Sequence, residues 1–134
     1  MEWTGNYRVE WDEYTKRHYA KVFQKKYRDE WAPTVRDITS VCERIDNMLQ
    51  YDRADLICAQ NEYKLVKLDF AIEGSRISPK SSGNRCILFI DENKRLVRVL
   101  LVYSKNEICV PNETQKWKTV VKEQFSDIGK IFSL

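Results

Sequence analysis

The segment SPKSSGNRCILFIDENKRLVRVLLVYSK, residues 78–105, decides the fold that the sequence predicts. Within it, RCILFI at 85–90 is a continuous apolar run, which indicates a strand buried on both faces. DENK at 91–94 has the composition of a hairpin turn, and RLVRVLLVYSK at 95–105 predicts the longest strand, which we place at the centre of a sheet. A β-hairpin therefore forms the core, and a Ser/Gly turn leads into it at one end.

The residues ahead of this hairpin predict one strand and two helices. YRVEW at 7–11 alternates and is rich in β-formers, so it indicates a short first strand. Over 12–30, aromatic and apolar residues recur at helical spacing between lysines and arginines, which is typical of an amphipathic helix. WAPT at 31–34 breaks that helix because proline disfavours helix in the residue before it, and a second apolar stripe covers 35–50. The short break implies an antiparallel helix hairpin.

The remaining residues complete an α+β domain. YDRADLICAQNEY at 51–63 predicts either a loop or a short helical extension, KLVKLDFAI at 64–72 alternates as a strand does, and EGSRISPKSSGN at 73–84 has the composition of a loop. NETQ at 112–115 is similar to a capping box at the start of a closing helix. We expect a single domain over 1–134, with the N-terminal strand and helix hairpin packed on one face of an antiparallel β-sheet, and a C-terminal helix.

Composition and cysteine content exclude several classes of protein. The chain is 43% hydrophobic and 32% charged with only four glycines, which excludes a disordered chain. No apolar run approaches the roughly 20 residues of a membrane helix, and the first residues show no signal-peptide pattern. The four cysteines form no CxxC pair and lie far in sequence from His18, the only histidine, so we expect no metal site. Free thiols without an export signal indicate a cytoplasmic protein with no membrane partner.

The positive charge of the chain is concentrated around the hairpin. Residues 64–105 contain nine Lys and Arg against four Asp and Glu, whereas residues 1–63 contain ten against twelve. A local positive field suits a polyanion such as nucleic acid. Lysines also protect strand edges from aggregation, so charge alone leaves both interpretations open.

Candidate site residues lie at the ends of the hairpin. The chain has no Walker A sequence and no GxGxxG, HExxH or GxSxG motif. Arg85 opens a strand, so its guanidinium has a rigid root and offers the fork that fits two phosphate oxygens. With the turn centred in DENK, Arg85 pairs with about residue 100. That pairing brings Lys105 towards Lys80 and sets Tyr103 beside Lys105.

A cation cluster of this kind can bind RNA and stabilise the negative charge that develops as a phosphate is attacked. Cleavage then needs only the neighbouring 2′-OH as nucleophile, held in line with the leaving 5′ oxygen. Lys67 and Arg76 are further basic candidates for contact with RNA, and Trp117 is a candidate to stack on a base. The alternative is that the strand ends are solvated and that both aromatic side chains, Tyr103 and Trp117, are core residues.

SPKSSGNRCILFI, a short turn and VRVLLVYSKNEI together resemble the RelE/ParE superfamily of type II toxin–antitoxin toxins. In RelE-type members a basic loop with serine and glycine leads into an arginine-headed strand, and a basic residue ends the next strand. The likeness in motif covers residues 74–108, and the likeness in element order covers almost the whole chain. Arg85 matches the strand-opening arginine, Lys105 the basic residue after the next strand, and Lys80 the basic loop position.

The resemblance implies a RelE-like mRNA interferase, a hydrolase that inhibits translation. Such an enzyme is a ribosome-dependent endoribonuclease that cuts mRNA, is held off by a cognate antitoxin, and uses no metal or small-molecule cofactor. Under this resemblance Arg85 and Lys105 bind and stabilise the scissile phosphate, and Lys80 holds the RNA backbone. Tyr103 or Trp117 then orients a base.

The sequence departs from the family near its C-terminal end. Many active members carry a tyrosine or histidine there, whereas EICVPNETQKW at 107–117 contains neither. Glu107 and Glu73 are the alternative bases that the chain offers. Two alternatives therefore stay open: a ParE-like inhibitor of DNA gyrase with the same fold, and a non-catalytic RNA- or protein-binding module.

Overall fold

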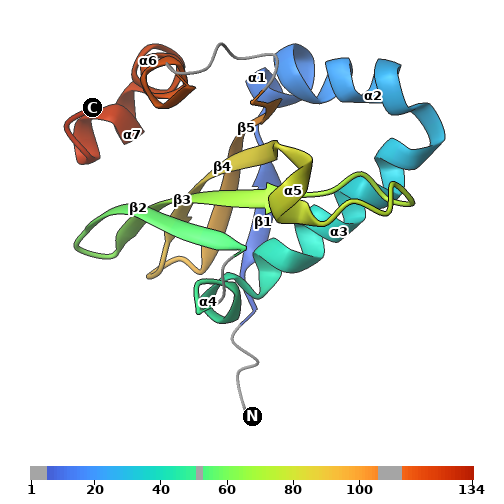
Figure 1. Cartoon of the computed structure of the whole chain (residues 1–134). Coiled ribbons are helices and arrows are strands. Elements are labelled where there is room, and N and C mark those ends of the chain that lie inside the picture. The colour runs from blue at the N-terminus through green and yellow to red at the C-terminus, as the bar shows by residue number, and fades with distance from the viewer. Residues whose placement is uncertain (1–5, 51–52, 106–112) are drawn as a thin grey trace.

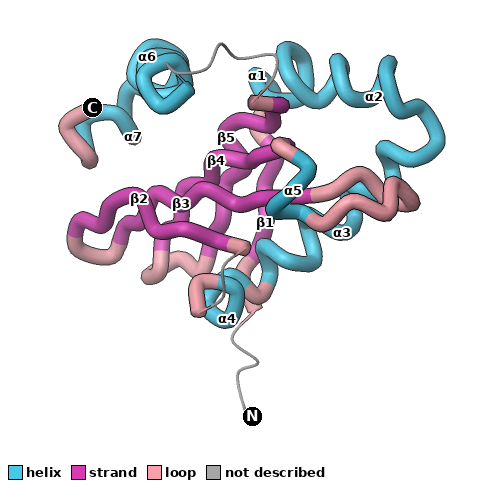
Figure 2. Tube along the Cα trace, in the orientation of Figure 1, coloured by secondary structure: helices cyan, strands magenta, loops and turns pink. Residues whose placement is uncertain are grey.

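The computed structural model describes residues 6–50, 53–105 and 113–134 (Figure 1). The described part is a mixed α+β structure whose five-stranded sheet has the order β1-β5-β4-β3-β2. The strands are β1 (Arg8–Trp11), β2 (Ala54–Gln60), β3 (Tyr63–Phe70), β4 (Asn84–Asp91) and β5 (Leu96–Ser104). The helices, shown with the loops in Figure 2, are α1 (Glu13–Thr15), η1 (Lys16–Ala20), α2 (Lys21–Tyr27), η2 (Arg28–Glu30), α3 (Trp31–Glu43), α4 (Ile45–Met48), α5 (Pro79–Ser82), α6 (Glu113–Gln124) and α7 (Ser126–Ile131).

The hairpin predicted at 85–105 is confirmed as β4 and β5. Every residue of β4 except Arg85 is buried, as its apolar sequence predicts. β5 is the longest strand in the described part, but β4 lies at the centre of the sheet because β1 adds to the outer side of β5. β1 runs parallel to β5, so the sheet is mixed and the prediction of a purely antiparallel sheet is wrong.

Residues 54–60 form the edge strand β2, where the sequence predicted a loop or a helical extension. An edge strand pairs with one neighbour only, and most side chains of β2 are exposed or half-buried. A bulge between Leu56 and Cys58 also changes which side chains share a face. The hydrophobic alternation that identifies a strand is therefore weak in ADLICAQ.

The first helical segment runs from Glu13 to Glu30, close to the predicted bounds, and includes the π-helical turn η1. The break falls at Arg28, whose φ of 51° ends α2, and so comes before WAPT. Pro33 lies in the first turn of α3, where its missing N–H removes no helical hydrogen bond. The chain reverses at this break, and α3 runs back along the sheet (Figure 1).

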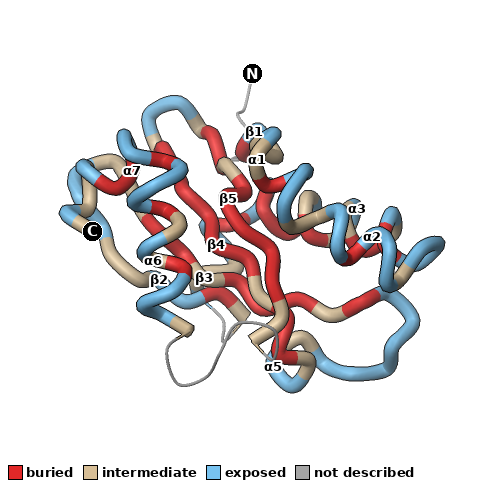
Figure 3. The backbone as a smooth tube through the Cα atoms, turned by 90° about the horizontal axis from the view of Figure 1, so that it is seen from above, coloured by how far each residue is buried: buried red, intermediate tan, exposed pale blue. Residues whose placement is uncertain are grey.

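Helices cover both faces of the sheet, and the C-terminal helices, for which the sequence predicted no face, lie on the face opposite α3. The core under α3 includes Ile38, Val41, Cys42, Val66, Leu68, Phe70 and Leu88. The core under α6 and α7 includes Leu65, Ile87, Phe89, Leu101, Trp117, Val121 and Ile128. Successive strand residues point to opposite faces, so neighbours in β3 and β4 serve different cores. Figure 1 shows α3 and α4 across the sheet from α6 and α7, and Figure 3 shows the buried strands between them.

A bulge in β5 sets the register of the hairpin. The register shifts between Ile87 and Leu88, which leaves Leu100 without a partner on β4. The buried Thr15 places its Oγ1 3.1 Å from the carbonyl oxygen of Val99, and this hydroxyl also contacts the carbonyl oxygen of Leu100. The hydroxyl of Thr15 therefore donates to backbone carbonyls of β5 at the point where the pairing between β5 and β1 ends.

Candidate functional site

The register places Arg85 opposite Tyr103 on β5 and opposite Asp69 on β3. The predicted pairing of Arg85 with about residue 100 is wrong. The hairpin turns later than expected, between Asp91 and Leu96, and the unpaired residue of the bulge moves the register by one more position. Because these three positions are directly opposite one another, their side chains share one face of the sheet.

Arg85 binds a carboxylate that the sequence analysis did not name. Its Nη1 donates to both carboxylate oxygens of Glu113 at 2.6 Å each. The hydroxyl of Tyr103 donates to Oε2 of the same carboxylate, also at 2.6 Å. Glu113 is the first residue of α6, so these bonds join α6 to the end of the sheet.

The guanidinium of Arg85 also has an unsatisfied donor. Its Nε lies 3.6 Å from Oδ1 of Asp69, which forms an ion pair but is too long for a good hydrogen bond. This buried Nε has no hydrogen-bond partner among the residues that the structure describes. A buried donor without a partner is costly, so the guanidinium of Arg85 is incompletely satisfied on the side that faces Asp69.

Burial and charge shift the pKa values of this group in different directions. Burial raises the pKa of Glu113, but the hydrogen bonds from Tyr103 and Arg85 outweigh it, and the net pKa is lowered. Burial raises the pKa of Tyr103, and the hydrogen bond to Glu113 raises it further. Burial also raises the pKa of Asp69, which the charge of Arg85 offsets only in part. The ionised form of Glu113 is therefore favoured in the folded chain, whereas the ionised form of Asp69 is disfavoured.

Lys67 lies on the same face of the sheet, two residues before Asp69 on β3. Its positive charge contributes to lowering the pKa of both Asp69 and Glu113. We call Lys67, Asp69, Arg85, Tyr103 and Glu113 the Arg85 cluster. Its members come from three adjacent strands and the start of α6.

Lys80 and Lys105 lie at the same end of the sheet. Lys80 is exposed in α5, and its charge acts on Asp69. The backbone N–H of Lys105 donates to the carbonyl oxygen of Gly83 at 2.8 Å. A Cβ on Gly83, whose φ is 77°, would approach Cγ of Lys105 to 3.3 Å. The structure thus brings the three predicted cations to one rim, with glycine at the point of closest approach.

The remaining predicted site residues do not join the Arg85 cluster in the described part of the structure. Arg76 is in the exposed loop between β3 and α5, with a φ of 63°. Trp117 is buried in the core under α6, so its ring is not accessible to a base. Glu73 is exposed in the same loop as Arg76, and Glu107 lies outside the described residues.

The sequence only partly indicates a role for Glu113 and Asp69, the two acids that were not predicted as site residues. Glu113 stands in the predicted start of a helix, where an acidic residue is favourable for the helix dipole, but this pattern does not name a partner on the sheet. Asp69 is a charged residue within an alternating strand. Its alternation with Phe70 and Leu68 predicted only which face it occupies.

The described residues include neither a metal-binding cluster nor a helix suited to cross a membrane. Within residues 6–50, 53–105 and 113–134, no group of three or more His, Cys, Asp or Glu side chains is arranged to hold a metal ion. Cys42, Cys58 and Cys86 are free thiols, and Cys109 lies outside the described residues. In the same part of the chain, no helix has the length and apolar character needed to cross a membrane.

Comparison with known proteins gives little beyond these observations. No family model matches the chain, and no curated protein sequence matches it. Among solved structures, the archaeal RelE–RelB complex from Pyrococcus horikoshii OT3 is similar to 75% of this chain and 96% of that chain, with 10% sequence identity and a TM-score of 0.44. A similarity of this size assigns neither a family nor an activity to the chain.

Proposed function

We propose that the chain is a RelE-like toxin that cleaves mRNA on the ribosome in the cytoplasm and is held off by a cognate antitoxin. The observation that supports this proposal is that Arg85 and Tyr103 together form an anion site, which we call the seat, occupied here by the carboxylate of Glu113. A carboxylate and a phosphodiester present similar pairs of oxygens to a guanidinium.

In the proposed reaction the scissile phosphate replaces Glu113 on Arg85. The 2′ oxygen of the preceding nucleotide attacks phosphorus, and the bond to the 5′ oxygen breaks, which leaves a cyclic phosphate and a 5′ hydroxyl. Arg85 and Tyr103 donate to the non-bridging oxygens, where negative charge increases. Asp69, whose pKa is raised, accepts the proton of the 2′-OH. Lys105 at the rim supplies a proton to the leaving 5′ oxygen.

The described arrangement is then a resting state. Glu113 competes with RNA for the same donors, so substrate must displace the start of α6. Lys67 and Lys80 remain beside the seat and attract the RNA backbone, as the basic excess of residues 64–105 predicts.

The test is expression of the chain in cells followed by primer-extension mapping of mRNA. The proposal predicts cuts in phase with codons that disappear with Arg85→Ala or Lys105→Ala. Lys94→Ala is a matched control, because Lys94 is an exposed lysine in the turn at the other end of the same hairpin. Growth arrest with intact mRNA would contradict the proposal and favour a ParE-like inhibitor of DNA gyrase.

A non-catalytic RNA- or protein-binding module is the second candidate. It is favoured by the two acids around Arg85, since Glu113 and Asp69 already balance its charge. In that case Arg85 serves to anchor α6, and its replacement lowers stability without changing any RNA. An antitoxin-like reading frame beside the gene would argue against such a module.

A further inference from the structure

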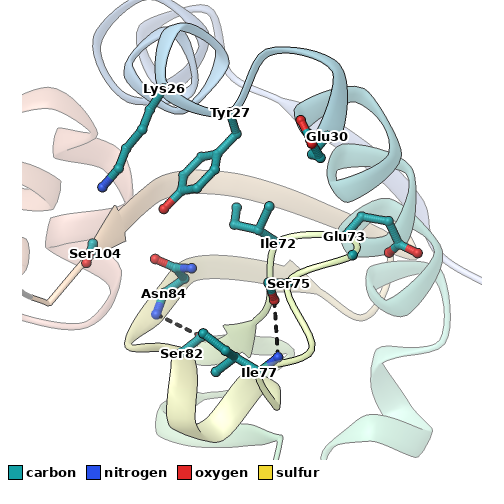
Figure 4. A pocket seen from close by; sticks show the side chains of 11 residues that line it. Lys26, Tyr27, Glu30, Ile72, Glu73, Ser75, Ile77, Ser82, Asn84 and Ser104 are labelled. Carbon is teal, nitrogen blue, oxygen red and sulfur yellow. Dashed lines mark hydrogen bonds between the residues drawn. The ribbon is translucent and has the colours of Figure 1, made fainter.

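A pocket of about 430 Å³ lies at the same end of the sheet as the Arg85 cluster, beneath α2 (Figure 4). Its walls include Lys26 and Tyr27 of α2, Ile72 after β3, and Asn84 and Ser104 at the paired ends of β4 and β5. Figure 4 shows Lys26 and Tyr27 reaching down from α2 towards Asn84, with Ile72 beside them. Volumes of roughly 300–1,000 Å³ are usual for small-molecule sites.

The pocket and the Arg85 cluster lie back to back. Asn84 pairs with Ser104, and the next pair along the two strands is Arg85 with Tyr103. Successive strand residues point to opposite faces, so the first pair faces α2 and the second faces α6. Consecutive residues of each strand therefore contribute to the two sites, on opposite faces of the sheet at the same end.

The wall formed by α2 suits a flat aromatic ring. Phe23 stacks on Trp31 with ring centroids 4.9 Å apart, and on Tyr27 with centroids 5.9 Å apart and planes 20° from parallel. Tyr27 is the ring of this stack that reaches the pocket. Nζ of Lys26 lies 5.4 Å from the centroid of Tyr27. A planar ligand beside Tyr27 would extend the stack and lie close to a cation.

The floor of the pocket offers one amide that suits a purine. The hydroxyl of Ser82 is already occupied, because it donates to a backbone carbonyl and accepts from the backbone N–H of Asn84 at 3.0 Å. Asn84 is only 7% exposed, and its side-chain amide carries both a donor and an acceptor. An asparagine amide can pair with N6 and N7 of adenine through two hydrogen bonds.

The charged side chains around the pocket favour one orientation of a bound nucleotide. Glu30 and Glu73 line it on the side away from Ser104, whereas Lys26 reaches towards Ser104 (Figure 4). Two carboxylates repel a phosphate, and an ammonium attracts one. A bound nucleotide would therefore point its phosphate towards the end that holds Ser104, which is the rim beside Arg85 and Lys105.

We propose that this pocket binds adenine, with the ring beside Tyr27, its N6 and N7 edge on Asn84, and the attached phosphate towards Lys26. That the adenine belongs to the RNA being cut, next to the scissile phosphate, rests on the proposed function. The binding of adenine itself does not depend on it. In RNA cleavage the pocket would make the enzyme prefer an adenine at one position of the codon.

Titration of the purified chain with AMP, followed by amide NMR, tests this inference. The expected result is that amides of Tyr27, Ile72 and Asn84 shift with AMP. Asn84→Asp and Tyr27→Leu should each weaken AMP binding by at least about tenfold, since one loses paired hydrogen bonds and the other loses stacking. Lys94→Ala should bind as the wild type does. The spectrum of each free variant establishes that it is folded, and either variant alone suffices for the test.

Three outcomes would overturn the inference: no AMP binding, equal shifts with inorganic phosphate, or equal affinity for CMP. Phosphate alone would indicate an anion site without a base, and CMP would show that Asn84 does not select a purine. AMP binding by a chain that leaves mRNA intact would keep the adenine site and reject the ribonuclease. Codon-phased cleavage by a chain that does not bind AMP would support the ribonuclease and reject the adenine site.

Discussion

Arg85 and Glu113 stand 28 residues apart in sequence and are joined by two contacts of 2.6 Å between the guanidinium and the carboxylate. The side chain of Arg85 is 20% exposed and that of Glu113 is 15% exposed, so water screens the pair only weakly. The loss of one partner removes a charge-assisted hydrogen bond, which costs about 1.5–3 kcal/mol, while Asp69 still faces Arg85 and the Tyr103 hydroxyl still donates to Glu113. The pair is therefore both an anchor for α6 and a barrier to any other anion on Arg85.

A double-mutant cycle should measure this coupling. Arg85→Gln and Glu113→Gln, alone and together, are expected to give a coupling energy of about 1–3 kcal/mol in urea unfolding. The matched control is the pair of Lys64 and Glu92, which has a contact of 2.8 Å but side chains that are 26% and 35% exposed. Its coupling should be about 0.2–1 kcal/mol. Additive effects at Arg85 and Glu113 would contradict the anchor.

Stability should fall in acid because of Glu113. Its pKa in the folded chain is lowered from the ordinary value of 4.5, so its stabilisation is complete above that value and is lost as the pH falls through the lower, folded-state pKa. Glu113→Gln should reduce this loss in urea unfolding measured between about pH 6 and pH 3. A pH profile unchanged by the substitution would contradict the lowered pKa.

Asp69 should change the pH dependence of stability in the opposite direction to Glu113. Its pKa is raised in the folded chain, so its ionised form opposes folding, and protonation in acid restores stability. Asp69→Asn removes this gain, and the variant should lose more stability on acidification than the wild type does. The same urea series measures it. A smaller loss than in the wild type would show that the folded chain favours the ionised Asp69.

Tyr103→Phe should lower the unfolding free energy by about 1.5–3 kcal/mol, because it removes a hydrogen bond to a charged group. Burial and the Glu113 carboxylate raise the pKa of Tyr103, so this phenol should stay protonated where exposed tyrosines ionise. Absorbance titration should then give the same ionisation curve near pH 10 for the wild type and the variant. Loss of one ionising tyrosine from that curve would contradict the burial of Tyr103.

Thr15→Val should cost about 1–2 kcal/mol, since it keeps the shape of the side chain and removes the donor at the β5 bulge. Thr119→Val is the matched control, because the exposed Thr119 hydroxyl bonds within α6 to the carbonyl of Gln115. The control should change stability by less than about 0.5 kcal/mol. Equal effects at Thr15 and Thr119 would show that the bulge contact contributes little.

Local sequence patterns predicted most helices and strands of this fold. The elements that were missed depend on contacts between residues far apart in sequence. The apolar run of β4 and the helical spacing of α2 and α3 are visible within a few residues. The edge strand β2 is not, because exposure and a bulge remove its alternation. The face that α6 covers also escaped prediction, although the apolar character of β4 on both sides required a layer on each face.

The candidate site was predicted in part for the same reason. Sequence position was enough to place Arg85 and Lys105 at one rim. The partner of Arg85 depends on how α6 docks, and the pairing with Tyr103 depends on a bulge at Leu100 that no turn motif announces. The buried position of Trp117 follows its helical spacing with Val121, which favoured the core over a base.

The central claim is that an RNA phosphate takes the seat of Glu113 on Arg85. The most direct test is the rate of cleavage of a ribosome-bound mRNA by purified wild-type, Arg85→Lys and Glu113→Gln chains, each assayed well below its unfolding temperature. The account predicts that Arg85→Lys loses about 100-fold or more, because a lysine cannot offer the same paired donors, and that Glu113→Gln cleaves at least as fast as the wild type. Intact mRNA with the wild type, or an unchanged rate with Arg85→Lys, would contradict it.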